Sequence, residues 1–444
     1  MENKRLHFNG IDMDTQTWRI APMTEAKLAA RIQIAAQPDP MATKDLVSWA
    51  NPKDIAQTGW GLIVHEDENP AVLEALDPLL NRRRAMAGKR FQTFTYLRHD
   101  TLDYRGFMNR HHITHTDVDP DNAPYYLLIV GPPDRIPFQF QYELGITHGV
   151  GRIDFEDPAQ YQSYAENVCR TEKTQHTRPA RFSLFGAEND ELTELSSQKL
   201  VLPLQDKLIP LMPNWQCSSW VGDKATKAQL HQLMGGEETP ALLFTAGHGV
   251  YFSKDKEKRI NSQGSLICSD WPGHGIPLEE AHYYGPQDVP LEADLRGTIL
   301  FHFSCFTAGT PEFDNFLGPN KTKRHNSKPF VAPLPKRLLA LENGPLAIVG
   351  HVDSAFQYSF MWDRKLHEID HFSDAFYKLA NGFPIGAAME SFNRRFAIVG
   401  AVVAGEIMNT GLNDTQKLRY WIAYHDARNY LILGDPALSI KVRI

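Results

Sequence analysis

The chain has 444 residues, 42% of them hydrophobic, which is enough for two or three domains or one long α/β domain with a subdomain. Its 46 basic and 53 acidic residues give a formal net charge of −7, and no strongly basic face is visible, which argues against nucleic acid as the main partner. No apolar run approaches the roughly 18 residues of a membrane span. The charged start, residues 1–18, lacks the apolar core of a signal peptide, so we expect a cytoplasmic protein with no membrane partner.

Apolar β-like runs alternate with helical patterns along the chain, which is typical of a mainly parallel sheet covered on both faces. In the first series we expect strands at 60–66, 91–97 and 123–133, and helices at 70–88 and 158–173. Residues 174–181 are polar and predict a linker.

A second series of alternating elements begins near residue 181. We expect strands at 181–188, 241–247, 297–304, 344–350 and 429–440, helices at 196–208, 226–236 and 331–344, and long helical stretches from 365 to 409. The layout predicts an N-terminal extension of unknown role (1–55), a first α/β half (56–180) and a second α/β half (181–444).

The four cysteines, Cys169, Cys217, Cys268 and Cys305, lie far apart with no CxxC pair. This spacing disfavours a zinc knuckle, a thioredoxin-type redox pair and a small disulfide scaffold. We therefore expect reduced thiols, any one of which could be a nucleophile.

Two of the expected strands end in residues with catalytic potential. The strand at 241–247 leads to His248, and the strand at 297–304 leads to Cys305. Ligands bind at the carboxyl ends of the strands in an open parallel sheet, so residues that follow neighbouring strands converge there. A thiol with a pKa near 8.5 also needs a nearby imidazole to act as a nucleophile at pH 7. The pair predicts nucleophilic acyl transfer.

The glycines around His248 fit the same chemistry. Gly247 allows a sharp turn off the strand, and Gly249 exposes its backbone N–H without a blocking side chain. We expect an oxyanion hole formed by the N–H groups of Gly249 and Cys305. Taken singly, a Gly-His-Gly turn and a small buried cysteine are common structural features. The occurrence of His248 and Cys305 together in one α/β half, in the order His then Cys, favours a catalytic role.

At these residues the chain resembles the caspase-like cysteine peptidases of clan CD, in particular the gingipain family and bacterial CHAT-type proteases. The resemblance extends to "YYLLIVGPPDRIPF", "GVGRIDFEDPAQYQSYAENVCRTE", "GPLAIVGHVDSAF" and "NYLILGDPALSI", and spans about residues 60 to 441. It implies a caspase-like three-layer α/β/α fold with an N-terminal subdomain (56–180) and a catalytic subdomain (181–444). It also implies that Cys305 attacks a peptide carbonyl while His248 protonates the leaving amine.

The resemblance leaves the residue that orients His248 open. Within the family a carboxylate just ahead of the Gly-Arg pair can take this role, but the position ahead of Gly151 and Arg152 is not acidic here. Glu143 lies a few residues too early.

Specificity in this clan depends on the S1 pocket, where an acidic residue would select Lys or Arg through a charge-assisted hydrogen bond. Asp270 and Asp353 are the candidates, and each could instead be a solvated loop carboxylate. The polar loop at 312–330 is the kind of segment in which proteolytic nicking concentrates. A processing site at Lys321, Lys323 or Arg324 and an unprocessed surface loop are the two alternatives.

We expect no metal and no cofactor, since the spacing of His111, His112, His115 and Asp117 is weak evidence for a ligand set. The sequence predicts a cysteine endopeptidase that acts on protein or peptide substrates and is controlled by an activating protease or a regulatory protein. The resemblance implies a role as a zymogen in bacterial antiviral defence or cell death. The rival is a catalytically silent caspase-like scaffold that binds peptide or protein partners.

Overall fold

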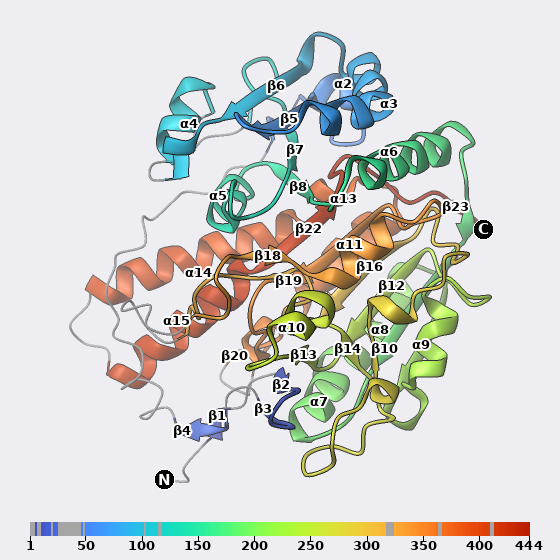
Figure 1. The fold of residues 1–444 in the computed structure, drawn as a ribbon, viewed down its shortest axis with the longest axis vertical. Helices are drawn as coiled ribbons and strands as arrows, with labels where there is room; N and C mark the ends of the chain where they lie inside the picture. Colours follow the sequence, from blue (N-terminus) through green and yellow to red (C-terminus); the bar gives the residue numbers. More distant parts are fainter. Residues whose placement is uncertain are drawn as a thin grey trace.

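The computed structural model describes residues 5–6, 10–18, 21–24, 46–47, 49–101, 104–113, 118–316, 324–362, 366–408 and 413–444. Its centre is a 10-stranded sheet in the order β11-β10-β12-β16-β19-β22-β8-β7-β5-β6. Figure 1 shows β5, β6, α2, α3 and α4 at one end of the long axis, the N-terminal strands β1 to β4 toward the other end, and β16, β19 and β22 between them. The expected α/β class with a mainly parallel sheet is confirmed.

The first half of the sheet is buried on both faces. Along β7, Leu127 and Ile129 pack into one apolar cluster, whereas Leu128 and Val130 pack into another, because successive side chains of a strand point to opposite faces. Helices therefore cover both sides, and the layers are α/β/α. The elements of this half are β5 (Trp60–His65), β6 (Phe91–Tyr96), β7 (Tyr126–Val130), β8 (Gly149–Ile153), α2 (Ile55–Thr58), α3 (Pro70–Ala87), α4 (Tyr104–Arg110), α5 (Phe138–Leu144) and α6 (Pro158–Lys173).

The second half is held by an aromatic core, in which Phe301 of the sheet contacts Phe372 and Phe376 of a covering helix. Its strands in the main sheet are β10 (Arg181–Gly186), β11 (Gln216–Val221), β12 (Leu242–Ala246), β16 (Ile299–Phe303), β19 (Ala347–His351) and β22 (Tyr430–Gly434). Its helices are α7 (Glu191–Ser196), α8 (Leu202–Leu211), α9 (Lys227–Leu233), α10 (Lys256–Ser262), α11 (Pro333–Leu339), α12 (Asp370–Ala380), α13 (Ile385–Ala388), α14 (Glu390–Met408) and α15 (Asp414–Arg428).

The direction of the strands reverses at one place in the sheet. β19 and β22 are antiparallel, whereas β22 runs parallel to β8 and all other neighbours in the sheet are parallel. The carboxyl ends of β10, β12, β16 and β19 therefore meet at one edge of the sheet, and those of β5, β7, β8 and β22 meet at the opposite edge. The loops that follow β12 and β16 consequently share their edge with the loops after β10 and β19.

A second, five-stranded sheet lies beside this edge, in the order β15-β14-β13-β2-β3. Residues 10–18, which the sequence places in an extension of unknown role, provide two of its strands and pair with β13 directly after His248. The strands are β2 (Gly10–Asp12), β3 (Thr17–Trp18), β13 (Gly249–Tyr251), β14 (Leu266–Ile267) and β15 (Tyr283–Tyr284). The remaining short pairs are β1 (Arg5–Leu6) with β4 (Met23–Thr24), β9 (Arg178–Pro179) with β23 (Val442–Arg443), β17 (Gly309–Thr310) with β18 (Phe330–Val331), and β20 (Met361–Trp362) with β21 (Leu366–His367).

Asp435, directly after β22, ties the sheet to the first half. Its fully buried carboxylate accepts hydrogen bonds from Trp60 Nε1 at 3.0 Å and from Arg83 Nε at 2.7 Å. Burial alone would lower the pKa of Arg83, but Asp435 and Glu172 outweigh it and raise that pKa well above its usual value. The buried guanidinium therefore stays charged and depends on these two carboxylates.

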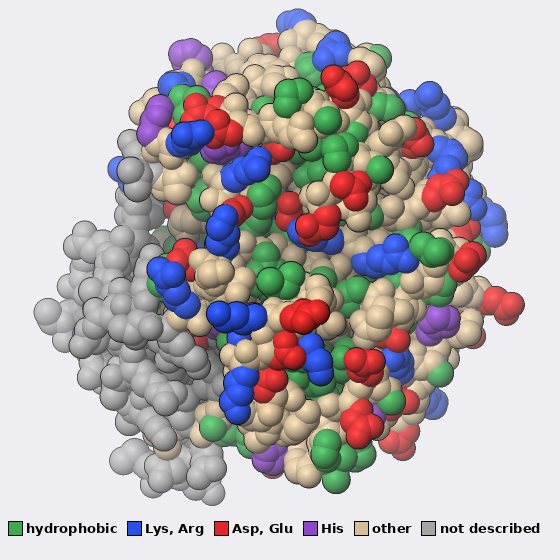
Figure 2. Space-filling view, in the orientation of Figure 1, with side chains coloured by type: hydrophobic (Ala, Val, Ile, Leu, Met, Phe, Trp, Pro, Cys, Tyr) green, Lys and Arg blue, Asp and Glu red, His purple; other side chains and the backbone are tan. Residues whose placement is uncertain are grey.

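Within the described part of the chain, no helix combines the length and the apolar character that crossing a membrane requires. On the face drawn in Figure 2, cationic and anionic side chains are interspersed.

Candidate active site

His248 and Cys305 follow adjacent strands at the same edge of the main sheet. β12 and β16 pair in parallel with Ala246 opposite Phe303, and each candidate residue comes two positions later. A Cβ on Gly249 would overlap the carbonyl oxygen of Cys305, so the chain after His248 lies directly against the backbone of the cysteine. The structure thus brings the two candidate residues together.

His248 contacts a carboxylate that comes from a third strand. Asp190 follows β10, the other neighbour of β12, and its Oδ2 accepts a hydrogen bond from Nε2 of His248 at 2.8 Å. The imidazole is fully buried, and the carboxylate is 12% exposed. No carboxylate in contact with His248 could be identified from the sequence, and the structure shows that Asp190 makes this contact.

The start of α7 holds Asp190 in position. Its Oδ1 accepts from the backbone N–H groups of Leu192 and Thr193 at 3.1 and 3.0 Å, as the N-cap of the helix, and its Oδ2 also accepts from the indole N–H of Trp18 at 3.1 Å. Burial alone would raise the pKa of Asp190, but the contacts with His248, Thr193 and Trp18 outweigh it and hold that pKa well below its ordinary range. Asp190 therefore faces His248 as an anion at neutral pH.

The second ring nitrogen of His248 is available for chemistry. Nδ1 is buried and has no hydrogen-bond partner among the described residues. An imidazole that donates from Nε2 to Asp190 carries its lone pair on Nδ1 and can accept a proton there. Burial lowers the pKa of two other buried histidines, His148 and His302, to about 3. His302 is a neutral ring that bonds to Thr245.

The thiol of Cys305 lies against the loop after β19. The N–H of Ala355 donates to Sγ at 3.2 Å, and the thiol lies 3.9 Å from the carbonyl oxygen of the same residue. Burial raises the pKa of Cys217 to about 11 and raises the pKa values of Cys169 and Cys268 above their usual value, which makes these three thiols poor nucleophiles.

Asp426 of α15 braces the loop that contacts Cys305. Its carboxylate accepts from the Phe356 N–H at 2.9 Å and from the Ser359 hydroxyl at 2.6 Å, and lies 3.2 Å from Nε2 of His351. The loop is thus held against the thiol, and the side chains of His248 and Cys305 are both fully buried.

Asp353 lies in this loop, next to the nucleophile candidate. Its carbonyl oxygen accepts from the N–H of Phe306 at 2.8 Å, and its φ of 67° lies in the left-handed region, which is unusual outside glycine. The fully buried carboxylate accepts from Ser354 N–H at 2.8 Å and from the Asn315 amide at 3.1 Å, and lies 3.3 Å from Nε2 of His325.

A second buried carboxyl group joins Asp353. The ligand atoms of Asp314, His325 and Asp353 all lie within 4.8 Å of one another, which is a spacing that a metal ion could use. His65, Glu66 and Asp67 form another such group at the opposite edge of the sheet. Of the four metal-ligand candidates considered from the sequence, His111 and His112 belong to neither group. His115 and Asp117 lie outside the described residues.

Asp270 is placed differently from Asp353. It is exposed, and its carboxylate accepts from the N–H of Lys227 at 2.6 Å, at the first residue of α9. In the loop with the candidate processing sites, Lys321 and Lys323 lie outside the described residues. Arg324 is 59% exposed and lies 3.2 Å from Oε1 of Glu312.

The backbone hydrogen bonds of β13 indicate where the N–H of the oxyanion candidate Gly249 points. Val250 donates to the Ser265 carbonyl on the β14 side, whereas the carbonyl of Tyr251 accepts from Met13 on the β2 side. Since successive residues of a strand direct their N–H and C=O groups to alternate sides, Gly249 directs its N–H to the β2 side.

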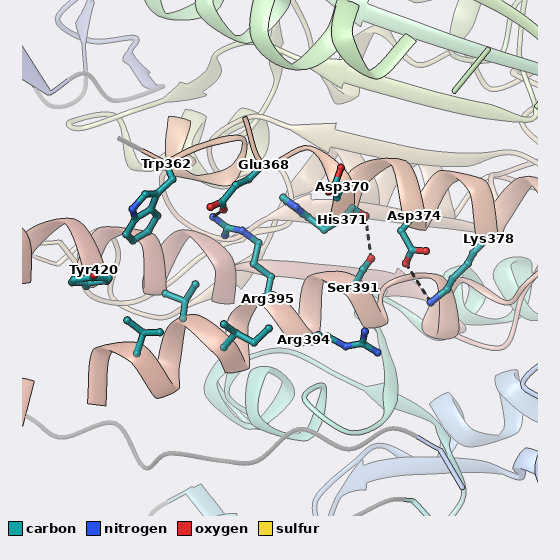
Figure 3. A pocket seen from close by; sticks show the side chains of 13 residues that line it. Trp362, Glu368, Asp370, His371, Asp374, Lys378, Ser391, Arg394, Arg395 and Tyr420 are labelled. Atoms are coloured by element: carbon teal, nitrogen blue, oxygen red, sulfur yellow. Dashed lines mark hydrogen bonds and ion pairs between the residues drawn. The ribbon is translucent and has the colours of Figure 1, made fainter. Parts of the chain in front are cut away.

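A pocket of about 710 Å³ lies between α12 and α14, and neither His248 nor Cys305 lines it. Figure 3 shows its polar end at Asp374, Lys378 and Arg394 and its aromatic end at Trp362 and Tyr420. The pocket is separate from the candidate site.

Searches of protein-family models and of curated protein sequences find no match for this chain. Among solved structures, one described as a protease matches with a TM-score of 0.51 and 13% sequence identity. The aligned region covers 86% of this chain and 78% of the protease chain. A complex of Porphyromonas gingivalis RgpB pro- and mature domains gives a TM-score of 0.48 and 12% sequence identity. The aligned region covers 86% of this chain and 79% of the matched chain. At this identity the first match establishes a shared fold.

Sequence reasoning missed Asp190 because it searched for the orienting carboxylate in the first half. Two signals mark it in the sequence. Asp190 lies two residues after the expected strand at 181–188, and the helix N-cap pattern Asp-x-x-Thr runs from Asp190 to Thr193.

Proposed function

We propose that the protein is a cysteine endopeptidase in which Cys305 is the nucleophile, His248 the general base and acid, and Asp190 the residue that orients the histidine. The observation that carries the proposal is the contact of His248 Nε2 with Asp190, which leaves Nδ1 without a hydrogen-bond partner among the described residues. His248 follows the strand that pairs with the one leading to Cys305. The fold shared with a solved protease supports the same conclusion.

Each proton transfer and bond change of the proposed reaction is assigned to one of these residues. His248 Nδ1 takes the proton of the Cys305 thiol, and Asp190 stabilises the imidazolium that results. The thiolate forms a bond to the peptide carbonyl carbon, and the C–N bond breaks as His248 returns the proton to the leaving amine. Water, deprotonated by His248, then cleaves the thioester and regenerates the thiol.

We propose the N–H groups of Cys305 and Gly249 as donors to the oxyanion. A Cβ at Gly249 would overlap the Cys305 carbonyl oxygen, so only glycine allows the two backbones to lie this close. Because the Gly249 N–H is directed to the β2 side, its contribution requires a turn of the His248–Gly249 peptide, which glycine permits.

For specificity we propose Asp353, rather than Asp270, as the acidic residue that selects Lys or Arg before the scissile bond. Asp353 lies in the loop that contacts Cys305, and Asp314 adds a second buried carboxyl group beside it. Asp270 instead lies outside this loop, exposed beside the first residue of α9.

The burial of His248 and Cys305 supports a regulated enzyme, since a peptide reaches the thiol only after the loop from Asp353 to Phe360 moves. We propose that processing at Lys321, Lys323 or Arg324, or a regulatory protein, drives this movement. The four cysteines form no disulfide, which fits a reducing compartment such as the cytoplasm. A role in bacterial antiviral defence or cell death is proposed from the resemblance alone.

The same burial favours one alternative, a silent scaffold that binds peptides or proteins. Fluorogenic peptides with Arg, Lys or Ala before the reporter amide separate the two, assayed with the native protein, with trypsin-nicked protein and with Cys305→Ala. We expect cleavage after Arg and Lys that Cys305→Ala abolishes. Peptide binding without cleavage in every form of the wild-type chain would instead establish the scaffold.

A further inference from the structure

The N-terminal segment from Gly10 to Trp18 is docked by specific contacts. Ile11 is fully buried in an apolar cluster with Val250, Phe252 and Trp271. The carboxylate of Asp14 accepts from the backbone N–H groups of Lys254 and Asp255 at 2.6 and 2.9 Å, and the Gln16 amide exchanges hydrogen bonds with the backbone of Leu278 in both directions. These contacts fix the segment against the residues that follow His248.

The hairpin formed by this segment brings Trp18 to the candidate site. β3 pairs with β2 so that Trp18 lies opposite Ile11, and its indole stacks on His274 with ring centroids 4.4 Å apart. The indole N–H donates to Oδ2 of Asp190 at 3.1 Å, the same oxygen that accepts from His248.

We propose that Trp18 is a positioning residue of the candidate active site, which holds Asp190 in the orientation that His248 requires. The inference rests on the proposed peptidase function, and it gives residues 10–18 a role in catalysis.

The geometry explains why a second donor matters. The N-terminus of α7 fixes Oδ1 of Asp190, and Trp18 fixes Oδ2, so the carboxylate is held at both oxygens and cannot rotate about its Cβ–Cγ bond. An indole N–H is only a donor, and it favours the ionised carboxylate that stabilises an imidazolium. Without the indole N–H, His248 would be the one remaining donor to Oδ2. The carboxylate of Asp190 would then be free to turn relative to the imidazole ring.

Two variants separate the N–H from the packing of the ring. Trp18→Phe keeps an aromatic ring on His274 but removes the donor, whereas His274→Ala keeps the donor and removes the stacking partner. Trp49→Phe, at a half-exposed tryptophan elsewhere in the N-terminal extension, is the matched control. The readouts are kcat and KM on an Arg peptide, the melting temperature, and the pH midpoint at which iodoacetamide alkylates Cys305, located by mass spectrometry.

For Trp18→Phe we expect kcat to fall about 10-fold, because a hydrogen bond to a charged group is lost, with KM unchanged and the melting temperature within about 2 °C. The alkylation midpoint should move to higher pH, because a poorly held Asp190 stabilises the thiolate–imidazolium pair less. His274→Ala should lose less than Trp18→Phe, and Trp49→Phe should match the wild type.

An unchanged kcat and an unchanged alkylation midpoint in Trp18→Phe would overturn the inference, as would an equal loss in His274→Ala. Alkylation needs no peptidase activity. If the wild-type chain cleaved no peptide, the proposed function would fail, while a shifted midpoint in Trp18→Phe would still support the positioning role.

Discussion

Replacing Asp190 by Asn tests the orientation of His248. Asparagine keeps one oxygen but places an NH₂ group where the other lies, and the wild-type oxygens accept from His248 at 2.8 Å and from the start of α7 at about 3 Å. If the amide oxygen remains on the helix, the NH₂ group faces Nε2 and turns the imidazole to the wrong tautomer. The lost hydrogen bond to a charged group, about 1.5–3 kcal/mol, lowers kcat/KM by about 10- to 150-fold, and the wrong tautomer extends the loss toward about 10⁴-fold.

The assay is kcat/KM for a fluorogenic Arg peptide, with circular dichroism to confirm folding. A kcat/KM for Asp190→Asn within about 3-fold of the wild type, with the fold intact, would refute the role of Asp190, because the loss of a charge-assisted hydrogen bond in a buried site is expected to cost more.

A measurement of stability against pH tests the same contact between Asp190 and His248. The pKa of Asp190 is lowered in the folded chain, so its stabilisation is present above the ordinary value near 3.9 and is lost as the pH falls below it. Acidification below about pH 4 should therefore remove less stability from Asp190→Asn than from the wild type.

The effects of four further substitutions are predicted. Gly249→Ala should abolish cleavage because its Cβ would overlap the Cys305 carbonyl, whereas Gly405→Ala, on an open face of α14, should leave kcat unchanged and stabilise the chain by about 0.5–1 kcal/mol. Asp435→Ala should lower the free energy of unfolding in urea by about 3–5 kcal/mol, because Arg83 would lose a buried partner; a loss below about 1 kcal/mol would contradict this. Asp353→Asn should raise KM for Arg and Lys peptides at least 10-fold and leave Ala peptides unaffected, and an equal effect on all three would contradict the S1 role.

The strand ends could be located from the sequence because β12 and β16 are mostly apolar runs, broken only by Thr245 and His302, that stop at Gly-His-Gly and Ser-Cys. A run of this kind marks a strand buried on both faces. The reversal between β19 and β22 could not be predicted, because the apolar pattern of a buried strand is the same in either direction.

One edge strand and one helix were not predicted because their sequence patterns are weak. The edge strand β11 is half exposed and reads Gln-Cys-Ser-Ser-Trp-Val, with neither an apolar run nor a regular alternation. The helix α15, also missed, has weak periodicity, although the Asn413 to Gln416 capping box marks its start. The position of residues 10–18 beside β13 depends on contacts across more than 200 residues, which local patterns do not encode.

The most direct test of the central claim is covalent labelling of the nucleophile. An acyloxymethyl ketone that carries Arg or Lys is incubated with the native and the trypsin-nicked protein, and the modified residue is located by peptide mass spectrometry. The account predicts a thioether on Cys305 that forms far more slowly in His248→Ala. An adduct on Cys217 instead, or no adduct on Cys305 in either form of the wild-type protein, would contradict it.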